Sequence, residues 1–265
     1  ADAGAVGHEL PAHARRAMAS CHAVEALEDG TLVGSQLEVA MVRASGWQQV
    51  AQGVVRSANG KESLEVLRRL RFDDRRALSG AVVRCPRTRE SYVYLKGSHE
   101  AIQAVATPSS TPSGYAGLAE HCAKDGFYTL GLAMKCLPLN LSSQHIADMP
   151  RSSLEANVGV CGLLLFRNEV RPDSSQVFKD LRQGSIRSVI CTGDGALTAI
   201  SVGRRSGVVT TSVVLLGDVR DDTLLWSDPD SGSSWDADAV ASSDCQLAVT
   251  RPAWRYLRER GALLE

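Results

Sequence analysis

The stretch IRSVICTGDGALTAISVGRRSGVVTTSVVLLGD, residues 186–218, decides the fold class of the C-terminal part of this chain. Its apolar runs predict strands over 186–194 and 208–218, and the residues between them predict a helix that ends at Gly207. A further helix is predicted just upstream, with Pro172 at its start. Alternation of strand, helix and strand is typical of a parallel sheet with right-handed crossovers, so this part is predicted to be α/β.

Upstream of residue 168 the pattern changes to mixed α+β. Strands are predicted over 64–72, 127–134 and 158–166, and a hairpin is predicted from Val82-Val83 and Tyr92–Leu95 around the polar turn CPRTRES. Helices are predicted over 37–45, stopped by Gly46, and over 115–124. The sequence therefore predicts two domains, residues 1–168 and 169–265. The Asp- and Ser-rich stretch 218–243 is expected to be a long surface loop.

Composition excludes several classes of function. The chain has 265 residues with 29 Lys and Arg against 30 Asp and Glu, so the net charge of −1 gives no basic surface for nucleic acid or an anionic membrane. The 7 cysteines include no C-x-x-C pair, which argues against a zinc site or a disulfide framework and favours a reducing compartment. The longest apolar stretch, 158–166, is too short to span a bilayer, so the chain as given is expected to be soluble.

Thr192, Gly193 and Asp194 form the first candidate site. They lie between a predicted strand and a helix, where free N–H groups and the positive end of the helix dipole suit a phosphate. A glycine lets the backbone approach such a ligand closely, and the threonine hydroxyl can donate a hydrogen bond. The alternative is an ordinary strand-to-helix turn with an Asp cap.

A second candidate site lies in the N-terminal part. Lys96, followed by Gly97, ends a hairpin strand and can hold a polyphosphate as a point charge. Phe72 ends another strand and can stack on a base, and Glu38 can accept a hydrogen bond from an exocyclic amine. Taken singly, each residue has a plainer explanation: a solvated lysine, a core phenylalanine and a solvated carboxylate.

Two other features of the sequence are weaker indications of function. The basic run RRLRFDDRR, residues 68–76, contains Asp73 and Asp74, so it is interpreted as a solvated face or a salt-bridged edge. Cys21 and His22 are two possible metal ligands without a third, so no metal site is predicted.

Taken together and in order, these segments resemble the large cytoplasmic loop of the P-type ATPases. MASCH (18–22) resembles M-A-T-C-H of the fifth subfamily, LVGSQLEVAMVRASGW (32–47) resembles L-V-G-D-P-L-E-x-x-M-F-x-x-x-G-W, and YLKGSHEAI (94–102) resembles V-K-G-x-P-E-x-I. DGFYTLGLAMK (125–135), GLLLFRNEVRPDS (162–174), 186–209 and LAVTRPAWRYL (247–257) resemble later motifs. The run ISV after TGD favours the transporter-like B branch of cation and polyamine pumps.

The resemblance implies a mixed antiparallel-sheet nucleotide-binding domain over 1–168, followed by part of a Rossmann-like, HAD-type phosphorylation domain. By matched position, Glu38 and Phe72 would contact adenine in one cleft, with Lys96 and Gly97 lining it. Thr192, Gly193 and Asp194 would hold the transferred phosphoryl group. The implied cofactors are ATP and Mg²⁺, the implied partners are the transmembrane and actuator domains of the same polypeptide, and the implied location is the cytosolic face of an endosomal, lysosomal or vacuolar membrane.

Departures from the family pattern set limits on this expectation. The strings D-K-T-G-T, with the phosphorylated Asp, and G-D-G-x-N-D, with the magnesium ligands, do not occur in the sequence. The chain alone is therefore expected to be inactive and to make no direct membrane contact. Within it, TGDN is replaced by TGDG, and a basic residue by Tyr128. These changes leave a degenerate, non-catalytic nucleotide-sensing or regulatory module as the alternative, while a soluble phosphatase is disfavoured because its nucleophilic Asp motif is absent.

Overall fold

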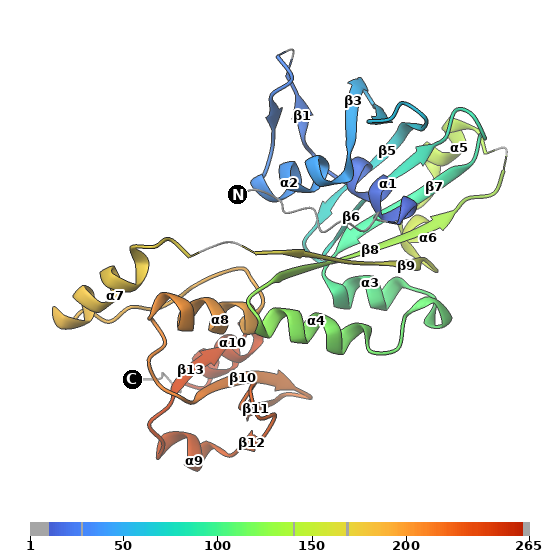
Figure 1. Ribbon diagram of the computed structural model, residues 1–265. Coiled ribbons are helices and arrows are strands. Elements are labelled where there is room, and N and C mark those ends of the chain that lie inside the picture. The colour runs from blue at the N-terminus through green and yellow to red at the C-terminus, as the bar shows by residue number, and fades with distance from the viewer. Residues whose placement is uncertain (1–10, 28, 140, 168–169, 262–265) are drawn as a thin grey trace. The chain divides into compact units, whose positions relative to one another are not determined.

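The computed structural model describes residues 11–27, 29–139, 141–167 and 170–261. The chain forms two compact units, Ala1–Ala119 with Thr129–Phe166, and Glu120–Tyr128 with Arg167–Glu265 (Figure 1). The domain boundary predicted at residues 168 and 169 lies outside the described residues. No helix within the described ranges is long and apolar enough to cross a lipid bilayer.

A seven-stranded sheet forms the centre of the first unit, with its strands in chain order and antiparallel wherever their register is defined. The strands are β3 (Trp47–Ala51), β4 (Val54–Ser57), β5 (Ser63–Asp73), β6 (Leu78–Arg84), β7 (Ser91–Gly97), β8 (Tyr128–Cys136) and β9 (Gly159–Phe166). Two short strands, β1 (Glu25–Ala26) and β2 (Leu32–Val33), pair separately. The mixed, antiparallel character expected of this part is confirmed.

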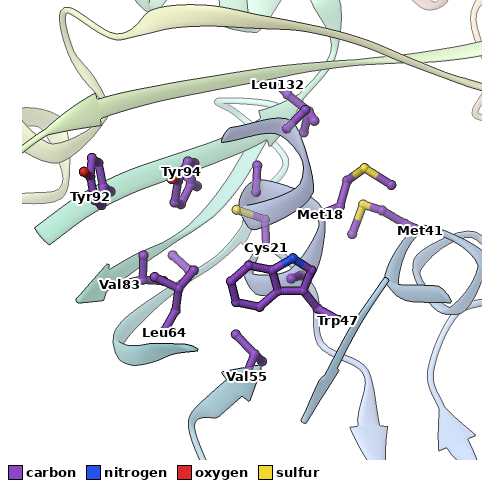
Figure 2. Packing of buried hydrophobic residues seen from close by; sticks show 14 residues of the cluster. Met18, Cys21, Met41, Trp47, Val55, Leu64, Val83, Tyr92, Tyr94 and Leu132 are labelled. Carbon is purple, nitrogen blue, oxygen red and sulfur yellow. The ribbon is translucent and has the colours of Figure 1, made fainter. Parts of the chain in front are cut away.

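The pleat of the sheet divides its apolar side chains between two hydrophobic cores. On β7, Tyr92 and Tyr94 belong to one core, whereas Val93 and Leu95 belong to the other. The first core packs the sheet against α1 (Ala12–Ser20) and α2 (Gln36–Ser45), and Figure 2 shows Met18, Cys21 and Met41 from these helices and the helix end among the sheet residues. Successive side chains of a strand point to opposite faces, so the hairpin strands are buried on both sides.

The opposite face of this sheet packs against three helices. Buried residues of α3 (His99–Val105), α5 (Ser143–Asp148) and α6 (Arg151–Glu155) belong to the second core. A short 3-10 helix, η1 (Pro108–Ser110), and α4 (Tyr115–Lys124) follow α3 along the chain. The helix α2 ends where predicted, because Gly46 takes the left-handed conformation, φ 69°, that a side chain would disfavour.

The second unit combines a four-stranded sheet with helices. Its strand order is β12-β11-β10-β13, and β10 pairs with β13 in parallel and with β11 in antiparallel orientation. The bounds are α7 (Ser174–Gln183), α8 (Ala196–Ser206), β10 (Val214–Arg220), β11 (Thr223–Ser227), β12 (Ser234–Trp235), α9 (Ala237–Ala241), β13 (Gln246–Val249) and α10 (Arg251–Glu259). The helix α8 ends at Gly207 as predicted, again in the left-handed conformation.

Two predictions for this unit are wrong. Residues 186–194 form no strand, because no described segment pairs with them, and the Val189 side chain is 77% exposed. The expected loop over 218–243 instead contains β11, β12 and α9, since its Asp and Ser residues occupy tight turns and the N-cap of α9 at Asp236. The helix expected from Pro172 is present as α7, although it begins at Ser174. Among the described residues, this sheet is therefore parallel only at the β10–β13 pair.

Candidate functional site

Glu38 and Lys96, predicted separately from two distant motifs, are joined in an ion pair. Glu38 lies in the first turn of α2, where the Ser35 side chain accepts a hydrogen bond from the Glu38 N–H. Lys96 is the penultimate residue of β7 and its Nζ donates to Glu38 Oε1 at 2.8 Å. The interpretation of Lys96 as a solvated lysine is wrong, because only 6% of this residue is exposed.

The surroundings of the pair keep Glu38 ionised at neutral pH. Burial alone would raise the pKa of Glu38, but the hydrogen bond and charge of Lys96, together with the Ala23 N–H, lower it below its usual range. The Ala23 N–H donates to Glu38 Oε2 at 3.1 Å. A desolvated ion pair adds little net stability compared with apolar packing.

Phe72 lies at the same end of the sheet as Lys96 and is exposed. Two residues of β5, Arg71 and Phe72, stand opposite the single residue Ser79 of β6, because the register shifts between Leu70 and Asp73. Ser79 in turn pairs with Lys96 on β7. Such a β-bulge leaves the ring 63% exposed rather than buried in a core, which contradicts the plainer interpretation of Phe72.

Gly97 has a steric role that is visible in the structure. A Cβ on Gly97 would lie 2.3 Å from the Ala77 carbonyl oxygen, closer than real side chains approach. Only glycine therefore lets the tip of the β5–β6 hairpin close over the end of β7. The predicted contact of Gly97 with a nucleotide stays a prediction.

Arg69 and the backbone of Ala23 are two features of this site that sequence reasoning missed. Arg69 Nη1 donates to the carbonyl oxygens of Ser20, at 3.0 Å, and His22. Arg68, its neighbour on β5, donates on the opposite face to the carbonyls of Ile146 and Met149. Arg69 is exposed, as a solvated face implies, and the ion pairs of Arg76 with Asp73 and Glu155 fit the salt-bridged edge, whereas the half-buried Arg68 fits neither. The alternation of a strand was the signal that could have separated Arg68 from Arg69.

The turn Thr192–Gly193–Asp194 lies in the second unit, directly before α8. Thr192 Oγ1 donates to Asp194 Oδ2 at 3.0 Å and accepts from the Asp194 N–H at 3.1 Å. The N-cap of α8 is Gly195, which offers no side-chain cap, so Asp194 is not the helix cap of the alternative interpretation. A Cβ on Gly193 or Gly195 would meet no atom of the described residues within 4 Å, so close packing does not require glycine at either position.

Tyr128 is the first residue of β8 but is grouped with the second unit, where its phenol is close enough to Asp194 to feel the carboxylate charge. The preceding carbonyl, of Phe127, accepts a hydrogen bond from Thr198 Oγ1 in the first turn of α8 at 3.1 Å. Burial raises the pKa of Tyr128, and the negative charge of Asp194 raises it further. The phenol is therefore neutral where the family pattern has a cation.

The described residues offer no cluster of side chains suited to binding a metal ion. No group of three or more His, Cys, Asp or Glu side chains is placed to hold an ion there. His22 uses both ring nitrogens on the backbone, at Ala19 O and Val24 N. The cysteines in the described ranges are free thiols.

Comparison of the sequence with known proteins identifies its relatives. No protein-family model matches the chain. Over 73% of the present chain it is 30% identical to human polyamine-transporting ATPase 13A2. Over 83% of the present chain it is 30% identical to the yeast (Saccharomyces cerevisiae) endoplasmic reticulum transmembrane helix translocase. It is 31% identical to the probable manganese-transporting ATPase PDR2 of Arabidopsis thaliana over 79%. The chain spans 18%, 18% and 17% of these three relatives. The chain therefore belongs to the P-type ATPases, in their fifth subfamily.

Proposed function

We propose that this chain is the ATP-binding portion of a P-type ATPase that transports cations or polyamines across a membrane. Residues 1–168 would be the nucleotide-binding domain, and residues 169–265 would be part of a HAD-type phosphorylation domain. The observation that carries the proposal is the buried Lys96–Glu38 pair, which places a cation and an acceptor side by side at one end of the sheet. The exposed Phe72 ring lies two strands away in the same row.

Each group matches a part of ATP. The Phe72 ring would stack on adenine, Glu38 would accept the exocyclic amine, and Lys96 would attract the phosphates. Thr192 and Gly193 would bind the phosphoryl group during its transfer to an Asp in D-K-T-G-T elsewhere in the polypeptide, with Asp194 completing that site. Mg²⁺ would arrive with the phosphates and neutralise their charge, and its protein ligands would lie outside this sequence.

Titration of the chain with ATP, followed by amide chemical shifts, tests the binding site. We expect a dissociation constant in the millimolar to high-micromolar range, roughly −4 to −6 kcal/mol. Lys96→Ala should weaken binding, while Lys61→Ala, which removes an exposed lysine elsewhere in the unit, should leave it unchanged. Equal responses from the wild type and Lys96→Ala would remove Lys96 from the site.

Tyr128 favours a second candidate function, a non-catalytic nucleotide-sensing module. A neutral phenol replaces the expected cation beside Asp194, and Gly195 replaces the expected side-chain amide. The longer polypeptide separates the two functions, because a pump would carry D-K-T-G-T, G-D-G-x-N-D and apolar spans of ~20 residues. Incubating that polypeptide with γ-labelled ATP should yield an acid-stable, hydroxylamine-sensitive phosphoprotein if it is a pump, and none if it only senses nucleotide.

A further inference from the structure

The peptide group that joins His22 to Ala23 is hydrogen-bonded to a charged side chain at each end. Its carbonyl oxygen accepts from Arg69 Nη1, and its N–H donates to Glu38 Oε2 at 3.1 Å. Glu38 Oε1 then accepts from Lys96 Nζ at 2.8 Å. Arg69, this peptide, Glu38 and Lys96 thus form one continuous series of hydrogen bonds, named below the Arg69–Lys96 chain.

The turn that carries this peptide is fixed from both sides. His22 Nδ1 accepts from the Val24 N–H at 3.1 Å, so the ring proton lies on Nε2, which donates to Ala19 O at 2.9 Å. Burial lowers the pKa of His22 and keeps the ring neutral in this arrangement. Arg69 also donates to Ser20 O at the C-terminus of α1, where a cation is favoured by the helix dipole.

The Arg69–Lys96 chain has a direct effect on Glu38. A cation at the carbonyl polarises the peptide and strengthens its N–H as a donor, because hydrogen bonds in series reinforce one another. With one carboxylate oxygen held by this N–H and the other by Lys96, the orientation of the carboxylate is set by Arg69 as well as by Lys96. Arg69 also shares β5 with Phe72, so one strand carries both the ring and the group that orients the carboxylate.

We propose that Arg69 is a positioning residue for nucleobase recognition: through the His22–Ala23 peptide it holds Glu38 where the exocyclic amine of adenine binds. This inference rests on the proposed function. It concerns a residue that would touch neither the base nor the phosphates. Its expected effect is on the preference of the site for adenine over purines with a 6-oxo group. Inosine triphosphate (ITP) is the matched probe, because its 6-oxo group presents an acceptor to the Glu38 carboxylate.

The experiment compares ATP and ITP affinity in the wild type and three variants. Glu38→Gln should abolish the preference for ATP, and Arg69→Gln should reduce it by about fivefold, the effect of one lost hydrogen bond. Arg69→Lys retains a cationic donor and should recover part of the preference. Arg68→Gln is the control, since Arg68 is the adjacent residue of β5 and also donates to two backbone carbonyls, but on the opposite face.

Hydrogen exchange of the Ala23 amide gives a readout without nucleotide. Arg69→Gln should raise its exchange rate about fivefold, and Arg68→Gln should leave it unchanged once corrected for global stability. A wild type that binds neither nucleotide would overturn the proposed function and this inference together. A wild type whose ATP preference is lost in Glu38→Gln but kept in Arg69→Gln would overturn the inference alone and leave the proposed function standing.

Discussion

The hydroxyl oxygen of Tyr115 occupies the space that a side chain on Gly131 would need: a Cβ there would lie 2.4 Å from it. Within the described ranges this hydroxyl is buried without a hydrogen-bond partner, which is costly. We expect Tyr115→Phe to stabilise the chain by about 1 kcal/mol. Gly131→Ala should destabilise it, because the new methyl group would collide with Tyr115 and Ile102. Urea unfolding measures both changes, and a Tyr115→Phe variant less stable than the wild type would contradict the first.

Breaking the Lys96–Glu38 pair from either side should be costly. Lys96→Met leaves a largely buried carboxylate without its cation, and we expect a loss of about 2 kcal/mol in the free energy of unfolding. The double variant with Glu38→Gln should lose less than the sum of the two single variants, as is usual for coupled residues. The exposed pair Arg171–Asp173 is the control and should show no measurable coupling. Strict additivity at Lys96 and Glu38 would show that the pair is not coupled in solution.

Phe72 should matter for binding and not for folding. Its ring is 63% exposed, so Phe72→Ala should change the free energy of unfolding by less than about 0.5 kcal/mol. The lost stacking should weaken ATP binding about tenfold. Val50→Ala removes an exposed apolar side chain from β3 and should leave ATP affinity unaltered. A strongly destabilised Phe72→Ala variant would place the ring in the core instead.

Stability should fall as the pH drops below neutrality, partly because of His22. Burial lowers the pKa of His22 below its ordinary value of 6.5 in the folded chain, so the unfolded chain takes up the proton first. The free energy of unfolding therefore decreases as the pH falls from about 6.5 towards the folded-state pKa. His22→Asn should flatten this dependence, which urea midpoints at pH 7.5 and 5.5 would reveal. Burial also lowers the pKa of His13, so the stability of the His22→Asn variant should still fall with decreasing pH, but less steeply.

Val189 should tolerate a charged substitution. Its side chain is 77% exposed, so Val189→Lys should change the free energy of unfolding by less than about 0.5 kcal/mol. The buried Val214 of β10 is the comparison, and Val214→Lys should prevent stable folding of its unit. A loss above about 2 kcal/mol in Val189→Lys would indicate that residues 186–191 pack as an inner strand after all.

The sequence predicted correctly those elements whose structure is determined by neighbouring residues along the chain. The hairpin of β6 and β7 follows from two apolar runs around a polar turn, and the ends of α2 and α8 follow from Gly46 and Gly207. Local signals failed at residues 186–194, because a strand exists only when a neighbour accepts its hydrogen bonds, and composition does not report the neighbour.

The candidate site, too, could be predicted only in part from the sequence. Motif positions singled out Glu38 and Lys96 individually, but nothing in the sequence shows that they bond to each other across 58 residues. Arg69 was hidden within a run of similar residues, since its role depends on the face of β5 it occupies and on a carbonyl contributed by a separate turn. Contacts between backbone and distant side chains leave no mark in one sequence.

The bulge at Arg71 and Phe72 has a consequence for comparing related chains. Arg69 and Phe72 are three positions apart, so a regular strand would turn them to opposite faces, whereas two residues opposite Ser79 return them to one face. A relative that lacked one residue here, and with it the bulge, would still place the ring and the guanidinium on one face of the strand. Aligning such proteins by strand register, with a gap at the bulge, will match the two side chains that an ungapped comparison would separate.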